Sequence, residues 1–129
     1  MTAHRDQSAG NLATVMREEN VGSVVIVDDD RPVGIVTDRD LVLEVLEPRA
    51  EPEDVSAGDI MTSAMATVYE DDGIFEAIET MLEHSVRRMP VVDTDGAMSG
   101  IVTLDDFVVM LADELDNLAD VVEAESPPY

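Results

Sequence analysis

Apolar residues follow the same order twice along the chain, first with helical and then with strand-like spacing. In each half, residues that recur every three to four positions precede a short continuous apolar run. This order predicts an amphipathic helix followed by a buried strand. The helical residues are Leu12, Val15 and Met16 in the first half and Ile74, Ile78, Met81 and Leu82 in the second, and the apolar runs are 24–27 and 89–92.

A turn, a second strand and a second helix are expected after each apolar run. The sequences at 28–32 and 93–97 are rich in Asp with Pro or Gly, which is typical of tight turns. The strands that follow should end at Thr37 and Thr103. The last helix of the second half, over residues 105–119, is expected to be the longer one. The apolar residues of these helices are Leu41, Val42, Val45 and Leu46, then Phe107, Val108, Leu111, Leu115 and Leu118.

The two halves are an internal repeat. A shift of 65 aligns residues 21–30 with 86–95, and a shift of 66 aligns 34–42 with 100–108. Because such self-similarity indicates a duplicated structural unit, the chain is divided into repeat one at 1–50, a linker plus repeat two at 51–120, and an acidic tail at 121–129.

Shorter features complete the prediction. Ser8 and Asp72 are the expected N-caps of the first helix in each repeat. A short helix over 55–61 and a lead-in strand over 66–68 are expected before repeat two. The same alignment puts Met1 opposite Ala66, which predicts a shortened lead-in strand in repeat one.

Charge and composition exclude several classes of function. The 129 residues carry 30 acidic and 7 basic side chains, all seven of them arginine, for a net charge of −23. This charge repels nucleic-acid phosphates, so no nucleic-acid partner is expected. The absence of cysteine excludes disulfides and cysteine-ligated zinc. No apolar run has the ~20 residues of a membrane span, and no signal peptide is visible, so a cytoplasmic location is expected.

The acidic composition also bears on the solvent. Many Asp and Glu residues with no lysine resemble the proteins of salt-in halophilic archaea, in which molar salt screens self-repulsion. An unusually acidic mesophilic protein is the alternative.

The repeated motifs resemble cystathionine-β-synthase (CBS) domains. Gly-Ile-Val-Thr-Asp-Arg-Asp-Leu at 34–41, Met-Pro-Val-Val-Asp at 89–93 and Gly-Ile-Val-Thr-Leu-Asp-Asp-Phe at 100–107 carry the likeness. The resemblance implies an α/β fold of two pseudo-symmetric repeats, each a small three-stranded sheet with two helices, packed sheet to sheet as a stand-alone pair. It also implies a homodimer, which the apolar surface of the second helices independently favours.

The resemblance further implies a site for an adenosine-containing ligand such as AMP, ADP, ATP or S-adenosylmethionine. Its ribose and phosphate residues would be Thr37, Asp40, Thr103 and Asp106. A threonine at a helix N-terminus suits a phosphate, and an Asp in the first turn can accept ribose hydroxyls. The candidate phosphate ligands are Arg39, Arg87 and Arg88, and the candidate cleft walls are Val24, Val25, Met65, Thr67, Met89 and Pro90.

Other interpretations stay open at this point. The threonines could simply cap helices, and the arginines could pair with surface carboxylates. The chain is expected to be no enzyme and to need no metal or cofactor. Its predicted function is regulatory sensing of an adenosyl ligand, signalled to an unknown partner. The alternative is a ligand-free dimerisation scaffold.

Overall fold

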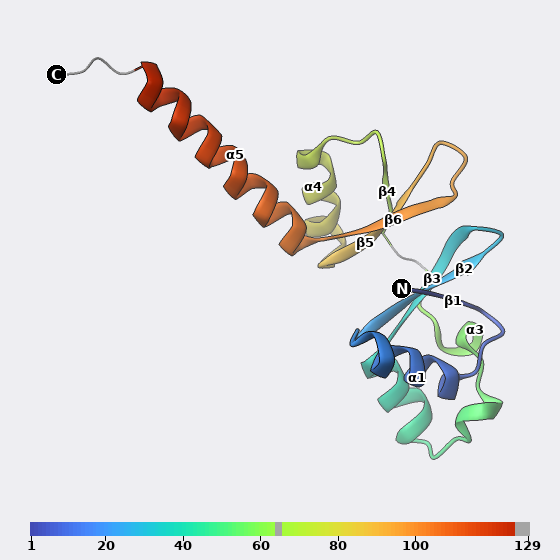
Figure 1. Ribbon diagram of the computed structural model, residues 1–129. Coiled ribbons are helices and arrows are strands. Elements are labelled where there is room, and N and C mark those ends of the chain that lie inside the picture. Colours follow the sequence, from blue (N-terminus) through green and yellow to red (C-terminus); the bar gives the residue numbers. More distant parts are fainter. Residues whose placement is uncertain (64–65, 126–129) are drawn as a thin grey trace.

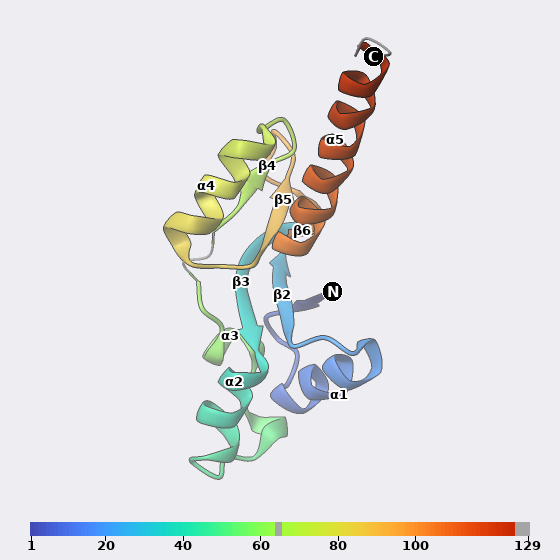
Figure 2. The same cartoon turned by 90° about the vertical axis from the view of Figure 1, so that its left-hand side faces the viewer.

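Two similar units make up the computed structural model, which describes residues 1–63 and 66–125. In Figures 1 and 2 the two sheets face each other at the centre, and the main helices lie on the outer sides. The first unit contains β1 Thr2–His4, α1 Ala9–Glu19, β2 Ser23–Asp28, β3 Arg31–Thr37, α2 Asp38–Leu41, a π-helical turn Val42–Leu46, a 3₁₀ turn Pro52–Asp54 and α3 Ala57–Ile60. The second contains β4 Val68–Tyr69, α4 Ile74–His84, β5 Arg88–Val92, β6 Met98–Thr103 and α5 Leu104–Glu125.

Both sheets have the same topology. The strand orders are β1-β2-β3 and β4-β5-β6, with the first pair of each sheet parallel and the second antiparallel. The parallel pair encloses the first helix of each unit, and a tight turn closes the antiparallel hairpin. The predicted α/β fold of two repeats, each a three-stranded sheet with helices, is therefore confirmed.

Strand alternation separates two faces of each sheet. In β2, Val24 and Ile26 are fully buried in one core cluster with Leu12 of α1, whereas Val25 is buried outside that cluster. Because successive side chains of a strand point to opposite faces, Val25 lies on the face turned toward the other unit. The second unit repeats this arrangement, with Met89 in its core cluster.

The first helix of each unit begins with different capping chemistry. The Ser8 hydroxyl accepts a hydrogen bond from the backbone N–H of Asn11, as predicted. The predicted cap Asp72 is wrong by one residue, because Gly73 is the N-cap of α4. The Asp72 carboxylate instead accepts from the backbone N–H of Tyr69 at 3.0 Å, so it closes the turn after β4.

The lead-in strands differ from their prediction. β1 has three residues and β4 has two, so the strand of repeat one is not the shorter one. Residues 66 and 67 precede β4, although the sequence placed the strand at 66–68. Strand pairing decides these limits, since Val68 and Tyr69 are the residues in register with Val91 and Val92.

The last helix is longer than predicted. α5 ends at Glu125 rather than near residue 119, so residues 121–125 of the expected tail are helical. The remainder of that tail, 126–129, lies outside the described residues. Figure 1 shows α5 projecting well beyond the rest of its unit.

The segment that leads into repeat two packs on the first unit. The N–H groups of Ala57 and Gly58 donate to the carbonyls of Gln7 and Arg5 at 2.8 and 2.9 Å. Thr62 then forms an antiparallel bridge with Ile35 of β3. This segment thereby extends the β3 edge of the first sheet.

Within the described residues, no helix is long and apolar enough to cross a membrane.

Candidate functional site

Thr37 and Asp40 form a reciprocal capping box at the end of β3. The Thr37 hydroxyl accepts from the Asp40 backbone N–H at 3.2 Å, and Asp40 Oδ2 accepts from the Thr37 N–H at 2.8 Å. Both side chains are half-buried. The threonine therefore ends the strand and begins α2, as predicted from the motif.

Thr103 and Asp106 repeat this geometry at the end of β6. The hydroxyl accepts from the Asp106 N–H at 3.1 Å, and Asp106 Oδ2 accepts from the Thr103 N–H at 3.0 Å. In each pair the capping bond uses only one carboxylate oxygen, so the other remains available as an acceptor. The capping interpretation is thus confirmed for both pairs, and it leaves room for ligand binding.

A backbone hydrogen bond fixes the start of each second helix against its own sheet. The Asp38 N–H donates to the Gly22 carbonyl at 2.9 Å, and the Leu104 N–H donates to the Arg87 carbonyl at 2.7 Å. These bonds join equivalent positions of the two repeats. The two Thr-x-x-Asp elements are therefore held in the same way by both units.

The three candidate phosphate ligands have different surroundings. Arg88 Nη1 donates to the Ser23 hydroxyl at 3.3 Å and so connects the two units. Arg87 pairs with Asp105 at 3.9 Å, with both side chains well exposed, which matches the surface-pair interpretation. Arg39 is exposed beside Asp40 on α2. Of the three, only Arg88 lies between the two units.

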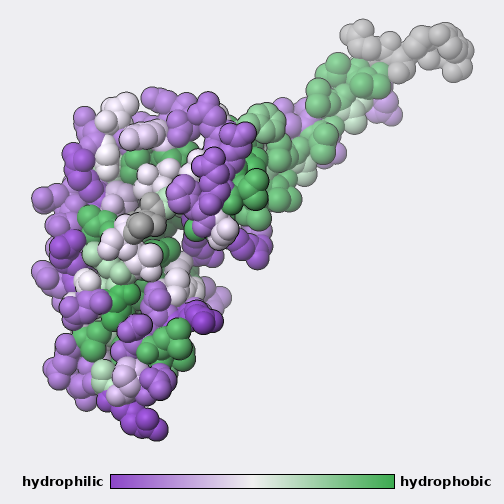
Figure 3. Space-filling model, turned by 180° about the vertical axis from the view of Figure 1, so that it is seen from behind, coloured by the Kyte–Doolittle hydropathy of each residue, from purple (hydrophilic) through white to green (hydrophobic). Residues whose placement is uncertain are grey.

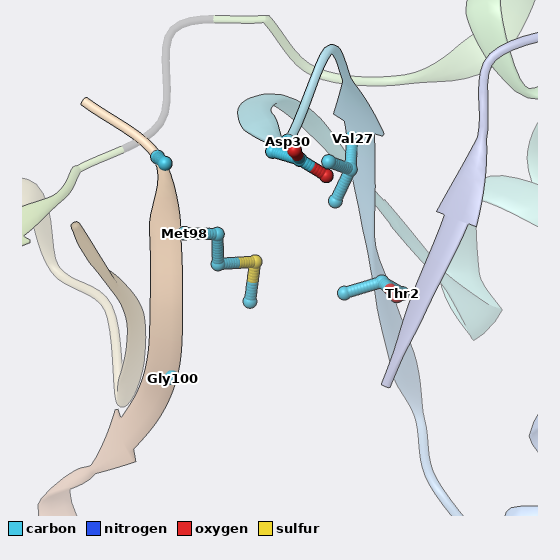
Figure 4. A pocket seen from close by; sticks show the side chains of 6 residues that line it. Thr2, Val27, Asp30, Met98 and Gly100 are labelled. Carbon is cyan, nitrogen blue, oxygen red and sulfur yellow. The ribbon is translucent and has the colours of Figure 1, made fainter. Parts of the chain in front are cut away.

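A cavity of about 450 Å³ opens between β1 and β2 of one unit and β6 of the other. Figure 4 shows Thr2, Val27 and Asp30 on one side of this space and Met98 on the other. The Met98 N–H donates to the Asp30 carbonyl at 2.7 Å, which ties the two hairpins together at its rim. The full lining is Thr2, Val27, Asp30, Ala97, Met98 and Gly100.

This cavity joins the lead-in strand of repeat one to the last strand of repeat two. Thr2 belongs to β1, whereas Met98 and Gly100 belong to β6, the strand that ends at Thr103. Motif matching within each repeat missed these lining residues because they converge only when the sheets pack. The one sequence feature that could have pointed to these residues was their position in the lead-in strand and the hairpin of the repeats.

The β3 side lacks the same opening. Gly34 and Gly100 are equivalent, but a Cβ on Gly34 would meet the Met61 sulfur at 2.5 Å, whereas one on Gly100 would meet nothing within 4 Å. Thr62 also exchanges two backbone hydrogen bonds with Ile35, of 2.9 and 3.0 Å. The segment after α3 thus covers β3 around Gly34 and Ile35, whereas no atom lies within 4 Å of a Cβ built on Gly100 of β6.

The predicted wall residues divide between the two faces of the sheets. Val24 and Met89 are wrong as cleft walls, because each is at most 1 % exposed and packs in the core of its own unit. Val25 and Pro90 are buried at equivalent positions on the opposite face, as a wall requires. Thr67 is exposed just before β4, and Met65 lies outside the described residues.

No group of three or more His, Cys, Asp or Glu side chains is arranged to hold a metal ion in the part of the chain that the structure describes.

Known proteins share this arrangement of sequence and structure. The chain is 42 % identical over 109 residues to an uncharacterized protein of Methanopyrus kandleri, a match of 84 % of this chain and 56 % of that protein. It is 38 % identical over 92 residues to hypoxic response protein 1 of Mycobacterium tuberculosis, a match of 70 % of this chain and 64 % of the relative. The chain thus spans less than two thirds of these curated relatives.

Two solved structures superpose well. The crystal structure of hypoxic response protein 1 with two coordinated zinc ions gives a TM-score of 0.76 at 32 % identity, over 85 % of this chain and 89 % of that one. CBSX2 of Arabidopsis thaliana in complex with AMP gives 0.71 at 28 % identity, over 90 % and 89 %. The CBS domain model matches residues 1–47 and 57–113, one segment for each repeat. The chain therefore belongs to the CBS domain family and contains a tandem pair of its repeats.

Proposed function

We propose that this chain is a regulatory module that binds an adenosine-containing ligand between its two repeats and signals its occupancy to a partner protein. The observation that carries the proposal is the open cavity between β1 and β6, on the strand that ends in Thr103 and Asp106. The complex of the similar protein CBSX2 with AMP supports the ligand class.

The cavity and the Thr-x-x-Asp element suit the two ends of a nucleotide. Gly100 lies three residues before Thr103, which corresponds to roughly 10 Å along a strand. The adenine would occupy the space next to Val27 and Met98, and the ribose would lie toward Asp106. The volume of the cavity, about 450 Å³, falls in the range of small-molecule sites.

The polar groups at the strand end suit the ribose and phosphate. Asp106 Oδ1 makes no hydrogen bond within the described residues, so it can accept a ribose hydroxyl while Oδ2 keeps its capping bond. The backbone N–H groups at the start of α5 favour a phosphate. Arg88 adds a guanidinium next to Thr103, its cross-strand partner in β5 and β6.

Signalling requires that the ligand prefer one arrangement of the two repeats. The units are joined across this region by the Met98–Asp30 and Arg88–Ser23 hydrogen bonds. A ligand bound between the two units would contact both of them. It would therefore favour the arrangement in which these hydrogen bonds join the units. No catalytic step is assigned, and the proposed role is binding alone.

Calorimetric titration of the full chain in 2 M KCl with AMP, ADP, ATP and S-adenosylmethionine tests the proposal. At least one ligand should bind, and Asp106→Ala should lower its affinity by roughly 5- to 150-fold, which corresponds to about 1–3 kcal/mol for an unpaired ribose hydroxyl.

Asp59→Ala is the matched control. Ser56 and Asp59 form the same capping box at the start of α3, away from the cavity. This variant should bind like the parent chain. If none of the four ligands binds, or if Asp106→Ala binds as well as the parent, the ligand-free scaffold becomes the better interpretation.

A further inference from the structure

The cavity between the two units carries a negative charge at one end. Among the described residues that line it, Asp30 is the charged one and Thr2 is the other polar side chain. Figure 4 shows the Asp30 side chain on the same side of the space as Val27. A carboxylate repels a phosphate, so a nucleotide in this cavity should turn its base, and not its phosphate, toward Asp30.

Asp30 differs from the other acidic residues of this surface. The chain has 30 Asp and Glu residues, and hydrophilic residues are spread over both units in the view of Figure 3. The Asp30 carbonyl, however, accepts the Met98 N–H at 2.7 Å, which fixes its main chain at the rim of the cavity. No described residue forms a hydrogen bond or ion pair with its carboxylate, so both oxygens can accept from a ligand.

The backbone of Asp30 has a conformation that favours glycine. Asp28 and Arg31 pair across the hairpin, so Asp29 and Asp30 form a two-residue loop. Their φ angles are 51° and 63°, as in a type I′ turn, which prefers Asn-Gly or Asp-Gly. The corresponding turn of repeat two has Gly96 at φ 84°. Asp30 thus occupies a position at which glycine would be more stable, and such a position points to a function of its side chain.

From these observations we infer that Asp30 selects the base of the ligand by accepting a hydrogen bond from the exocyclic 6-amino group of adenine. The inference rests on the proposed function and adds its base-selecting residue. An ionised carboxylate only accepts hydrogen bonds, and it suits the amino group of a base. Val27 and Met98 supply apolar contacts to the ring, while Arg88 lies beside Thr103 at the phosphate end. In this orientation the phosphate faces the guanidinium and the amino group faces the carboxylate.

This contact makes affinity depend on one functional group of the ligand. Purine riboside 5′-monophosphate has a hydrogen in place of the 6-amino group of AMP and is otherwise identical. AMP should bind the parent chain roughly tenfold more tightly than this analogue, as expected for a hydrogen bond to a charged acceptor.

Calorimetric titration of the full chain with both ligands in 2 M KCl tests the inference. Asp30→Gly should bind AMP and the analogue with equal affinity, because it lacks the acceptor. Its melting temperature should be at least that of the parent, because the substitution gives the turn the preferred Asp-Gly sequence. Loss of selectivity in a variant of undiminished stability separates recognition of the base from a role in folding.

Asp29→Gly is the matched control in the same turn. Asp29 is exposed and also has a positive φ, but it is not among the described residues that line the cavity. This variant should keep the roughly tenfold preference for AMP.

Four outcomes would overturn the inference. The first is equal affinity of the parent chain for AMP and the analogue, and the second is a preference that survives in Asp30→Gly or disappears in Asp29→Gly. The third is tighter binding of GMP than of AMP that Asp30→Gly abolishes, since the carboxylate would then accept from the N1–H and 2-amino groups of guanine. These three leave the proposed function intact. The fourth is a parent chain that does not bind AMP; binding of S-adenosylmethionine would then keep the proposed function, and binding of no adenosyl ligand would overturn both.

Discussion

Arg88 Nη1 donates a hydrogen bond to the Ser23 hydroxyl over 3.3 Å, and the two residues are counterparts in the two repeats, 65 positions apart. A contact between counterparts lies at the pseudo-twofold axis that relates the units. Ser23 is the cross-strand partner of Thr37, and Arg88 is that of Thr103. Both Thr-x-x-Asp elements therefore flank this axis. The Arg88 guanidinium places a positive charge close to it.

Replacement of Arg88 should separate phosphate recognition from nucleoside recognition. We expect Arg88→Ala to weaken AMP binding by roughly tenfold, the typical effect of a charge-assisted hydrogen bond, and to leave adenosine binding nearly unchanged. Ser23→Ala removes the neutral partner of the same hydrogen bond and serves as the control. Equal losses for AMP and adenosine in calorimetric titrations would show that Arg88 acts through the packing of the two units.

Larger side chains at the two equivalent glycines should have opposite effects. A Cβ on Gly100 meets no atom within 4 Å, so Gly100→Val should keep a melting temperature close to that of the parent, and its added bulk beside the cavity should weaken nucleotide binding. Gly34→Ala presses on Met61, which should cost about 1–3 kcal/mol of unfolding free energy. Thermal melting and titration of both variants check this, and retained binding by Gly100→Val would place the ligand elsewhere.

The two aspartates should differ in importance. The lead-in strand of repeat one is not shorter than that of repeat two, so strand length does not distinguish the two sites. The expected difference comes from Met61 and Thr62, which cover β3, whereas no such segment covers Gly100 of β6. We expect Asp40→Ala to reduce nucleotide affinity less than Asp106→Ala does. If Asp40→Ala alone abolishes binding in equilibrium dialysis, the working site lies at β3.

Stability should increase with salt. The net charge is −23, and two ion pairs with arginine occur among the described residues, Arg5–Asp28 and Arg87–Asp105. Screening of the remaining repulsion should raise the melting temperature clearly between about 0.1 and 2 M KCl. Circular dichroism melts in KCl measure this directly. A melting temperature that does not change with salt contradicts the halophilic interpretation.

The sequence by itself determined the local architecture. Apolar spacing located the helices and strands of both repeats, and the turn residues located the hairpins. The strands end at Thr37 and Thr103 as expected, because a threonine followed three residues later by an aspartate forms a capping box from local contacts alone. Such features depend on neighbours in the chain, so the residue order suffices to predict them.

Only the tertiary structure decided which residues share a cavity and which surface is exposed. The sequence placed Val24 and Val25 on the same cleft wall, but strand alternation turns one into the core and the other toward the second unit. Thr2 and Gly100 meet across the cavity because the two sheets pack face to face. These relationships depend on which sheet edge faces the other unit, and contacts between residues about a hundred positions apart are not encoded in local periodicity.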